Sequence, residues 1–329
     1  MTGAPLDEHV VDRRAVCSSP ADPRQLAVRR RYDYSNELVE VAFDDGRVLM
    51  LKWTRHLQLL PVALRTAQLA ARLLREVAEM PVPEYVELPG RPGEAPVLAY
   101  WRIPHPTLKE VWPSLGDAAR RKAVSEWGAL LRRMHMVHLA GHGPLLEAQQ
   151  IERTLGDFLR DDLQDRLRPA AQVDWPAGAE VMDLLLAWLP EAEARAESHA
   201  RLLHGDLHQA NVLCDHAGDD IQVIGVIDLD EAWAGPPEAE LARIEVLHGP
   251  LFGQPLPGSW FELLVEGYGS ALDGHLLGFF RAYQLLNLGY HAAVTGLEAH
   301  ADDVARAAEA EANALSRRVC RHIEVVASI

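Results

Sequence analysis

The chain has 329 residues, 48% hydrophobic and 24% charged, the balance of a globular protein long enough for one large domain or two packed parts. Its net charge of −16, from 32 basic and 48 acidic residues, argues against a nucleic-acid partner and fits either a cationic substrate or simple solubility. No apolar run could cross a bilayer, no secretory signal is evident, and three widely spaced cysteines suggest neither disulfides nor a zinc cluster, so we expect a cytoplasmic protein with no membrane partner.

Residues 1–103 predict a small α+β unit. The first thirty residues are polar and indicate no regular element. Two β-rich runs within residues 38–53 flank Asp44, Asp45 and Gly46, which is a hairpin signal. Apolar residues then recur at helical spacing over residues 62–80, until Pro81 and Pro83 stop the helix, and residues 95–103 predict another strand.

Residues 104–329 predict a second, mainly helical unit, and the pair Pro104 and Pro106 is the candidate hinge. Amphipathic helices are expected over residues 117–141 and 151–167, with a third inside residues 179–200. A β-rich segment follows from Leu202 to Asp230, and residues 237–329 are mostly helical in pattern.

The β-rich segment carries the residues with chemical meaning. His204, Gly205 and Asp206 form a polar turn, Asn211 follows Asp206 by five positions, and an apolar strand ends in Asp228. A carboxylate can accept a proton from a hydroxyl group, and carboxylate and amide oxygens are the ligands that Mg²⁺ prefers. Protein kinases use the same Asp-to-Asn interval followed by a second Asp for phosphoryl transfer.

The segments HGDLHQANVL and VIGVIDLDEA resemble the aminoglycoside phosphotransferase and choline-kinase superfamily, whose pattern is H-G-D-x-H-x-x-N followed by I-D. The resemblance implies an α+β, protein-kinase-like bilobal fold with a small β-rich N-lobe and a large mainly helical C-lobe. It also implies that Asp206 is the catalytic base, that His204 braces its loop, and that Asn211 and Asp228 bind magnesium.

The resemblance extends more weakly to residues 1–103. Lys52 lies in an apolar strand and would bind the α- and β-phosphates, unless it faces solvent on an edge strand. Ser35 and Asn36 match a phosphate-covering turn or form an ordinary turn. The backbone from Trp101 to Ile103 would bind the adenine edge.

One departure from the family pattern concerns the partner of Lys52. The family places a glutamate in the small-lobe helix, where this chain has residues 65–69 without an acid. Either Gln68 or Glu76 takes its place, or the predicted helix register is wrong.

Other polar residues allow both a functional and a structural interpretation. His204 and His208 could hold zinc, although a loop-shaping role for His208 fits the glycine between them better. His135 is expected to pack or cap its helix. Asp230 is either a third acid of the site or a solvent-facing residue, and Glu240 is expected to brace the catalytic loop.

Candidates for substrate recognition are weaker. An acidic helix could form a wall for an amino-sugar substrate or simply be a solvated face; its acids are Asp157, Asp161, Asp162 and Asp165. Glu262, Glu266 and Asp273 are further acidic candidates. Trp233 could stack on a substrate ring or pack in the core.

The sequence therefore predicts an ATP-dependent O-phosphotransferase with Mg²⁺, with GTP as the alternative nucleotide. The expected acceptor is a hydroxyl group of an aminoglycoside-like antibiotic, in resistance or biosynthesis. Other acceptors stay open: macrolide, peptide or nucleoside antibiotics, choline, homoserine and sugars. The rivals are a catalytically silent nucleotide-binding protein and a protein kinase. Both a monomer and a homodimer are compatible with the sequence.

Overall fold

The computed structural model describes residues 27–32, 36–43, 45–54, 60–88, 97–170, 176–196, 200–217, 220–247 and 259–295. Its first part is an antiparallel five-stranded sheet in the order β1-β2-β3-β5-β4. The strands are β1 (Ala27–Tyr32), β2 (Asn36–Ala42), β3 (Val48–Thr54), β4 (Tyr85–Leu88) and β5 (Val97–Trp101). The predicted hairpin is β2–β3, with Gly46 at a φ of 82°. Strand β1 lies partly where the sequence indicated no element, so that expectation is wrong there.

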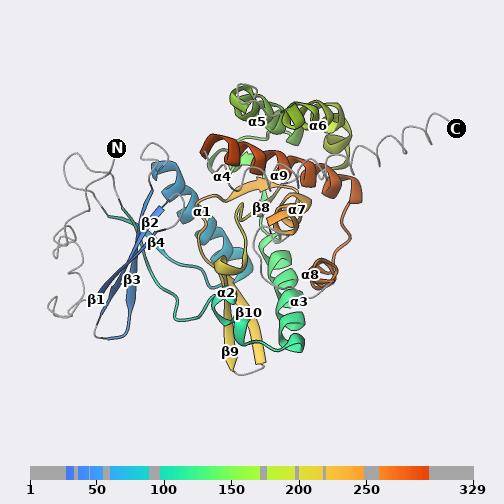
Figure 1. Ribbon diagram of the computed structural model, residues 1–329. Helices are drawn as coiled ribbons and strands as arrows, with labels where there is room; N and C mark the ends of the chain where they lie inside the picture. Colours follow the sequence, from blue (N-terminus) through green and yellow to red (C-terminus); the bar gives the residue numbers. More distant parts are fainter. Residues whose placement is uncertain are drawn as a thin grey trace.

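Helix α1 (Leu60–Ala78) lies between β3 and β4 in the chain and matches the helix expected over residues 62–80. Its apolar stripe buries Leu64, Ala67 and Leu74, as period-3.6 spacing requires. In Figure 1 the helix lies between the sheet and the helical part of the chain. The sheet and α1 are called the small lobe below, and the elements from α2 onward the large lobe.

The large lobe is mainly helical, as predicted. Its helices are α2 (Leu108–Val111), α3 (Asp117–Met134), α4 (Leu145–Ala148), α5 (Leu155–Ala170), α6 (Pro176–Arg195), α7 (Pro237–Leu247), α8 (Trp260–Tyr268) and α9 (Gly274–Thr295). Two expected boundaries are wrong. Helix α3 ends at Met134 because β6 (His138–Leu139) pairs with Arg201 and Ala200, and α5 begins four residues later than expected.

The predicted β-rich segment splits into two small sheets. Strands β9 (Val212–Ala217) and β10 (Asp220–Val226) form a hairpin. Strands β8 (Ala200–Leu203), β11 (Trp233–Gly235) and β7 (Gly143–Pro144) join β6 in the order β6-β8-β11-β7. The loop with Asp206 therefore starts at the end of β8 and finishes where β9 begins.

Helices α3 and α8 meet through their backbones. A Cβ atom added at Gly128 would lie 2.0 Å from the carbonyl oxygen of Leu264, and one at Gly267 would lie 1.9 Å from that of Ser125. Only glycine allows so close an approach. Within the described ranges, no helix has the length and apolar character needed to cross a bilayer.

Candidate active site

The loop between β8 and β9 is shaped by His204 and Gly205. Gly205 has a φ of 84°, and a Cβ there would lie 2.1 Å from the carbonyl oxygen of Glu231, so glycine is required. The His204 ring is fully buried. Its Nδ1 accepts from the backbone N–H of Asp206 at 3.3 Å, and its Nε2 lies 2.8 Å from the carbonyl oxygen of Ile227. One neutral tautomer satisfies both contacts, which ties the loop to the strand end before Asp228.

Asn211 and His208 complete the same turn. The Asn211 side chain is 5% exposed and donates from Nδ2 to the backbone carbonyl of Asp206 at 2.9 Å. His208 caps the short 3₁₀ turn by accepting from the backbone N–H of Ala210. Because both ring nitrogens of His204 are engaged, it cannot join His208 as a zinc ligand. The described residues hold no group of three or more His, Cys, Asp or Glu side chains arranged for a metal ion.

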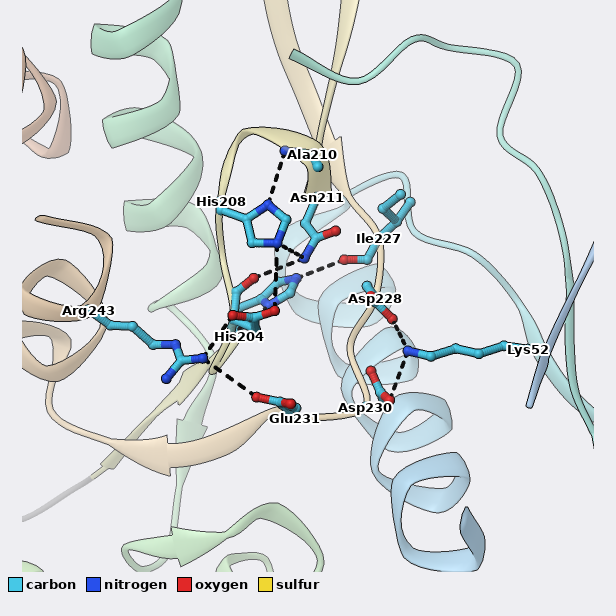
Figure 2. Close-up of polar contacts among 11 residues, drawn as sticks. Lys52, His204, His208, Ala210, Asn211, Ile227, Asp228, Asp230, Glu231 and Arg243 are labelled. Carbon is cyan, nitrogen blue, oxygen red and sulfur yellow. Dashed lines mark hydrogen bonds and ion pairs between the residues drawn. The ribbon is translucent and has the colours of Figure 1, made fainter. Parts of the chain in front are cut away.

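Asp228 follows β10 in a left-handed backbone conformation with a φ of 67°, which is uncommon for a residue with a Cβ. Its backbone N–H donates to the phenol oxygen of Tyr85 at 3.0 Å. Its Oδ1 lies 2.5 Å from Nζ of Lys52, and Oδ2 of Asp230 lies 3.0 Å from the same nitrogen. Figure 2 shows Lys52 reaching across from the small lobe to both aspartates.

The charged groups of this cluster shift one another's pKa values. Burial by itself would lower the pKa of Lys52, but the two carboxylates outweigh it and raise that pKa above its ordinary value. Burial opposes ionisation of Asp228, yet Lys52 holds its pKa below normal. Burial and the neighbouring charge of Asp228 raise the pKa of Asp230 to about 7. Asp230 is thus a third acid of the site and not a solvent-facing residue.

Lys52 is only 3% exposed, and β3 lies between β2 and β5, so the edge-strand alternative is wrong. Both proposed helix partners are also wrong. Gln68 donates to the backbone carbonyl of Tyr85, and Glu76 is exposed on the last turns of α1. Lys52 instead pairs with acids that lie 176 and 178 positions further along the chain.

Sequence reasoning missed Arg243. From α7, its guanidinium donates to Oδ1 of Asp206 at 2.8 Å and lies 3.7 Å from Oε2 of Glu231 (Figure 2). Burial alone would raise the pKa of Asp206, but Arg243, followed by His208, holds it below its ordinary value. Asp206 is therefore an ionised carboxylate. The one signal in the sequence that indicates Arg243 is its position on α7, three residues after Glu240. Side chains three apart on a helix share a face.

Glu240 braces the loop as expected. Its Oε2 accepts from the backbone N–H groups of His204 and Gly205, and burial raises its pKa. His135 packs at the end of α3, also as expected: it is 4% exposed, and its Nδ1 lies 3.0 Å from the hydroxyl oxygen of Tyr268.

Of the other small-lobe candidates, the structure describes the surroundings of Trp101 and Ile103. Ser35 lies outside the described residues, and Asn36 begins β2, with its side chain not described. Trp101 is 39% exposed and contacts Phe43 and Arg47 on the sheet surface. Ile103 follows β5, and its carbonyl oxygen accepts from the backbone N–H of His105.

The candidates for substrate recognition lie in two regions of the large lobe, one around α5 and Trp233 and the other around α8 and the start of α9. Trp233 packs on Phe158 at 5.5 Å between ring centroids, and its ring also lies beside Gly205. Asp157 and Asp161 are exposed on α5 and pair with Arg160 and Arg153. Asp162 accepts from the hydroxyl of Tyr283, whereas Asp165 is exposed.

Glu262 and Glu266 are exposed on α8, which packs against α3 and not against the loop of Asp206 (Figure 1). Asp273 pairs with Arg195 and caps the start of α9. The structure therefore does not bring these three acids to Asp206.

Comparison with known proteins agrees with this arrangement. The model of the Phosphotransferase enzyme family (APH) matches residues 28–279. Three solved structures are similar in fold. A thermostable mutant of aminoglycoside phosphotransferase APH(4)-Ia, as a ternary complex with AMP-PNP and hygromycin B, has a TM-score of 0.63 at 18% identity, covering 89% of this chain and 94% of that one.

The GDP complex of a mutant of aminoglycoside 2′-phosphotransferase-IIIa has a TM-score of 0.62 at 14% identity, with coverages of 88% and 91%. The macrolide 2′-phosphotransferase MphH from Brachybacterium faecium has 0.55 at 20%, with coverages of 89% and 93%. These likenesses confirm the predicted α+β, kinase-like bilobal fold class.

Proposed function

The chain belongs to the phosphotransferase enzyme family, and from that premise we propose that it transfers the γ-phosphoryl group of ATP to a hydroxyl group of an aminoglycoside-like antibiotic. The observation that carries this proposal is the convergence of Lys52, Asp206 and Asp228. Lys52 reaches Asp228 from the small lobe (Figure 2), and the His204 ring ties the loop of Asp206 to Ile227, next to Asp228. The enzyme class, a small-molecule kinase, follows from the family.

Asp206 is suited to accept the proton of the acceptor hydroxyl. It is ionised because Arg243 lies 2.8 Å from Oδ1, and its side chain keeps 32% exposure, so an acceptor can reach it. A carboxylate general base must be ionised and within hydrogen-bond reach of the proton that it accepts. Arg243 holds that carboxylate in place, and Glu240 fixes the two backbone amides before it.

The donor set fits Mg²⁺. Asp228 and Asp230 present carboxylate oxygens to the same point, 2.5 Å and 3.0 Å from one buried ammonium group, and the amide oxygen of Asn211 is available because the contacts to Asp206 and His208 use its nitrogen. Magnesium keeps several waters and is bound in proteins by one or two carboxylates plus phosphate oxygens. When bound, it supplies charge neutralisation for the transferred group. Asn211 and Asp228 would hold it.

Lys52 would bind the α- and β-phosphates. Ser35 and Asn36 would cover the phosphates, and the backbone from Trp101 to Ile103 would bind the adenine. We also propose that the chain divides into its two lobes at residue 103 and that the protein is cytoplasmic. GTP stays as the alternative nucleotide, since one similar structure is a GDP complex.

The aminoglycoside-like acceptor is supported by the net charge of −16, because an acidic protein attracts cationic amino sugars at long range. The similar structures include enzymes named for aminoglycosides and for macrolides, so macrolides are the first alternative, followed by nucleoside and peptide antibiotics, choline, homoserine and sugars.

The test is release of ADP from ATP and Mg²⁺ over a panel of these acceptors, with mass spectrometry of the product. We expect one acceptor class to gain a single phosphate. The Asp206→Asn and Asp228→Asn variants should lose turnover, while Asp183→Asn, an exposed aspartate of α6, should not. Nucleotide binding without transfer to any acceptor would favour a silent regulatory protein, and full activity of Asp206→Asn would refute the proposal.

A further inference from the structure

Asp228 has two positively charged partners under the function proposed above. Its Oδ1 lies 2.5 Å from the buried Nζ of Lys52, and the same carboxylate would hold magnesium. Two cations that share one carboxylate repel each other, so Asp228 binds Lys52 less tightly when the metal is there. A buried ammonium group that loses its anion is strongly destabilised. Lys52 therefore needs a second anion in the state that carries out phosphoryl transfer.

Asp230 is placed to be that anion. Its Oδ2 lies 3.0 Å from Nζ of Lys52, and Figure 2 shows the two carboxylates approaching Nζ from different sides. The side chain of Asp230 is 18% exposed, against 33% for Asp228, so Asp228 is the more open of the two to an incoming metal ion. The backbone N–H of Ala232 donates to the carbonyl oxygen of Leu229 at 3.2 Å and closes the turn that carries Asp230. The position of Asp230 is therefore set by the chain itself.

Two acids of the small lobe are the alternatives to Asp230. Glu76 is the single acid of α1, and it is exposed on the last turns of this helix. Glu40 of β2 is buried and lies opposite Met50. Since the faces alternate along a strand, Glu40 and Lys52 share a face of the sheet. The hydrogen bonds of Nζ nevertheless go to the two aspartates, so Glu40 is the matched control for Asp230.

We propose, on the basis of the proposed function, that Asp230 is a positioning residue, which keeps Lys52 directed at the nucleotide phosphates while Asp228 holds magnesium. Lysine has a flexible four-carbon side chain, so an anion must fix its ammonium group. An ammonium group has three N–H donors. With one of them kept on Asp230, the others can reach phosphate oxygens. The two aspartates on either side of the buried Leu229 thus have separate tasks.

The test is isothermal titration calorimetry of the full chain with a non-hydrolysable ATP analogue, once with excess EDTA and once with saturating Mg²⁺. We expect Asp230→Asn to weaken binding about tenfold with Mg²⁺, because the charge-assisted hydrogen bond to Lys52 is lost. The loss should be smaller with EDTA, where Asp228 still pairs with Lys52. Asp230→Glu keeps the charge and should recover part of the affinity.

Further variants separate the positioning of Lys52 from other roles of Asp230. In a Lys52→Met background, Asp230→Asn should not weaken binding further, because the ammonium group that Asp230 positions is absent. Glu40→Gln should bind the analogue like the unmodified protein in both conditions. Circular dichroism checks that each variant is folded, and Asp230→Ser takes the place of Asp230→Asn if that variant does not fold.

The inference is overturned if Asp230→Asn binds the analogue normally with Mg²⁺, or if its loss is the same with EDTA or in the Lys52→Met background. It is also overturned if Glu40→Gln loses as much affinity, or if a higher Mg²⁺ concentration restores the affinity of Asp230→Asn, which would make Asp230 a metal ligand. In all these cases the unmodified protein binds the analogue and the proposed function stands. A lack of binding by the unmodified protein would refute that function, and this inference with it.

Discussion

The phenol oxygen of Tyr85 lies 3.0 Å from the backbone nitrogen of Asp228, so a side chain of β4 in the small lobe holds the backbone of an acid 143 positions later. Tyr85 is buried and packs edge-on against Tyr100 at 5.1 Å. The bond supports Asp228 in its left-handed conformation, with a φ of 67°. It therefore couples the small-lobe sheet to the candidate metal site.

We expect Tyr85→Phe to lower kcat by about tenfold, because it removes this bond and leaves the N–H of Asp228 unpaired in a buried place. The KM for the acceptor should change little. Steady-state kinetics checks this, with Tyr100→Phe as the matched control, since Tyr100 packs against Tyr85 while the bond to Asp228 comes from the hydroxyl of Tyr85. Equal losses of kcat in both variants would mean that Tyr85 contributes by side-chain packing alone.

Arg243 should matter for turnover more than for folding. We expect Arg243→Gln to reduce kcat on the order of a hundredfold, because a preorganised charged donor next to a reacting group contributes this much. Arg243→Lys should recover part of the loss, since it keeps the positive charge near Asp206. Kinetics of both variants, with circular dichroism to confirm folding, checks this. Turnover that is insensitive to both changes would contradict a role for the Arg243–Asp206 pair.

Replacements of Lys52 and Asp230 should have non-additive effects on the free energy of unfolding. Lys52→Met leaves two neighbouring carboxylates without their cation, and we expect a loss of about 1–3 kcal/mol in the free energy of unfolding, below the value for a fully buried pair because Asp228 is 33% exposed. Adding Asp230→Asn to Lys52→Met should restore part of this, because it removes the repulsion. A double-mutant cycle from urea unfolding measures the coupling. Strictly additive effects would show that the cluster is not coupled.

The burial of His135 predicts acid sensitivity. Its pKa is about 3 in the folded chain and about 6.5 when exposed, so the unfolded chain binds one more proton between these values. The stabilising effect of the neutral ring is complete above about pH 6.5 and is lost as the pH falls toward 3, at up to about 1.4 kcal/mol per pH unit. The facing groups are Tyr268, which contacts the ring, and Arg201, whose charge reinforces the effect.

Urea unfolding across this range, in chloride buffers without phosphate, measures the slope for the unmodified protein and for His135→Gln. The variant should have a shallower dependence on pH, although it is less stable at pH 7. Carboxylates that titrate in the same range contribute equally to both proteins, so the difference between the slopes belongs to His135. Parallel curves would contradict the prediction.

The sequence allowed the loop of Asp206 to be predicted because its chemistry is local. The interval from Asp206 to Asn211 and the apolar strand before Asp228 are contiguous patterns, and Lys52 was recognisable as a charge inside an apolar strand. By contrast, Tyr85 and Arg243 act through contacts 143 and 37 positions away along the chain. No periodicity of their own segments indicates such contacts.

The errors at element ends have a similar origin. Residues 135–141 continue the helical pattern of α3, yet His138 and Leu139 pair with β8, and tertiary pairing overrides a weak local preference. The family pattern predicts an acidic partner of Lys52 on α1, whereas the folded chain supplies two acids from the segment after β10.

Helices α3 and α8 touch through backbone atoms at Gly128 and Gly267, whereas α5, α6 and α9 meet through interchangeable side chains such as Leu159, Leu185 and Phe280. A backbone contact cannot be retuned by exchanging one side chain for a larger or smaller one. Neither glycine of the α3–α8 pair can therefore take a larger residue unless one helix moves. The contacts among α5, α6 and α9, by contrast, can adjust by small repacking steps when one side chain changes size.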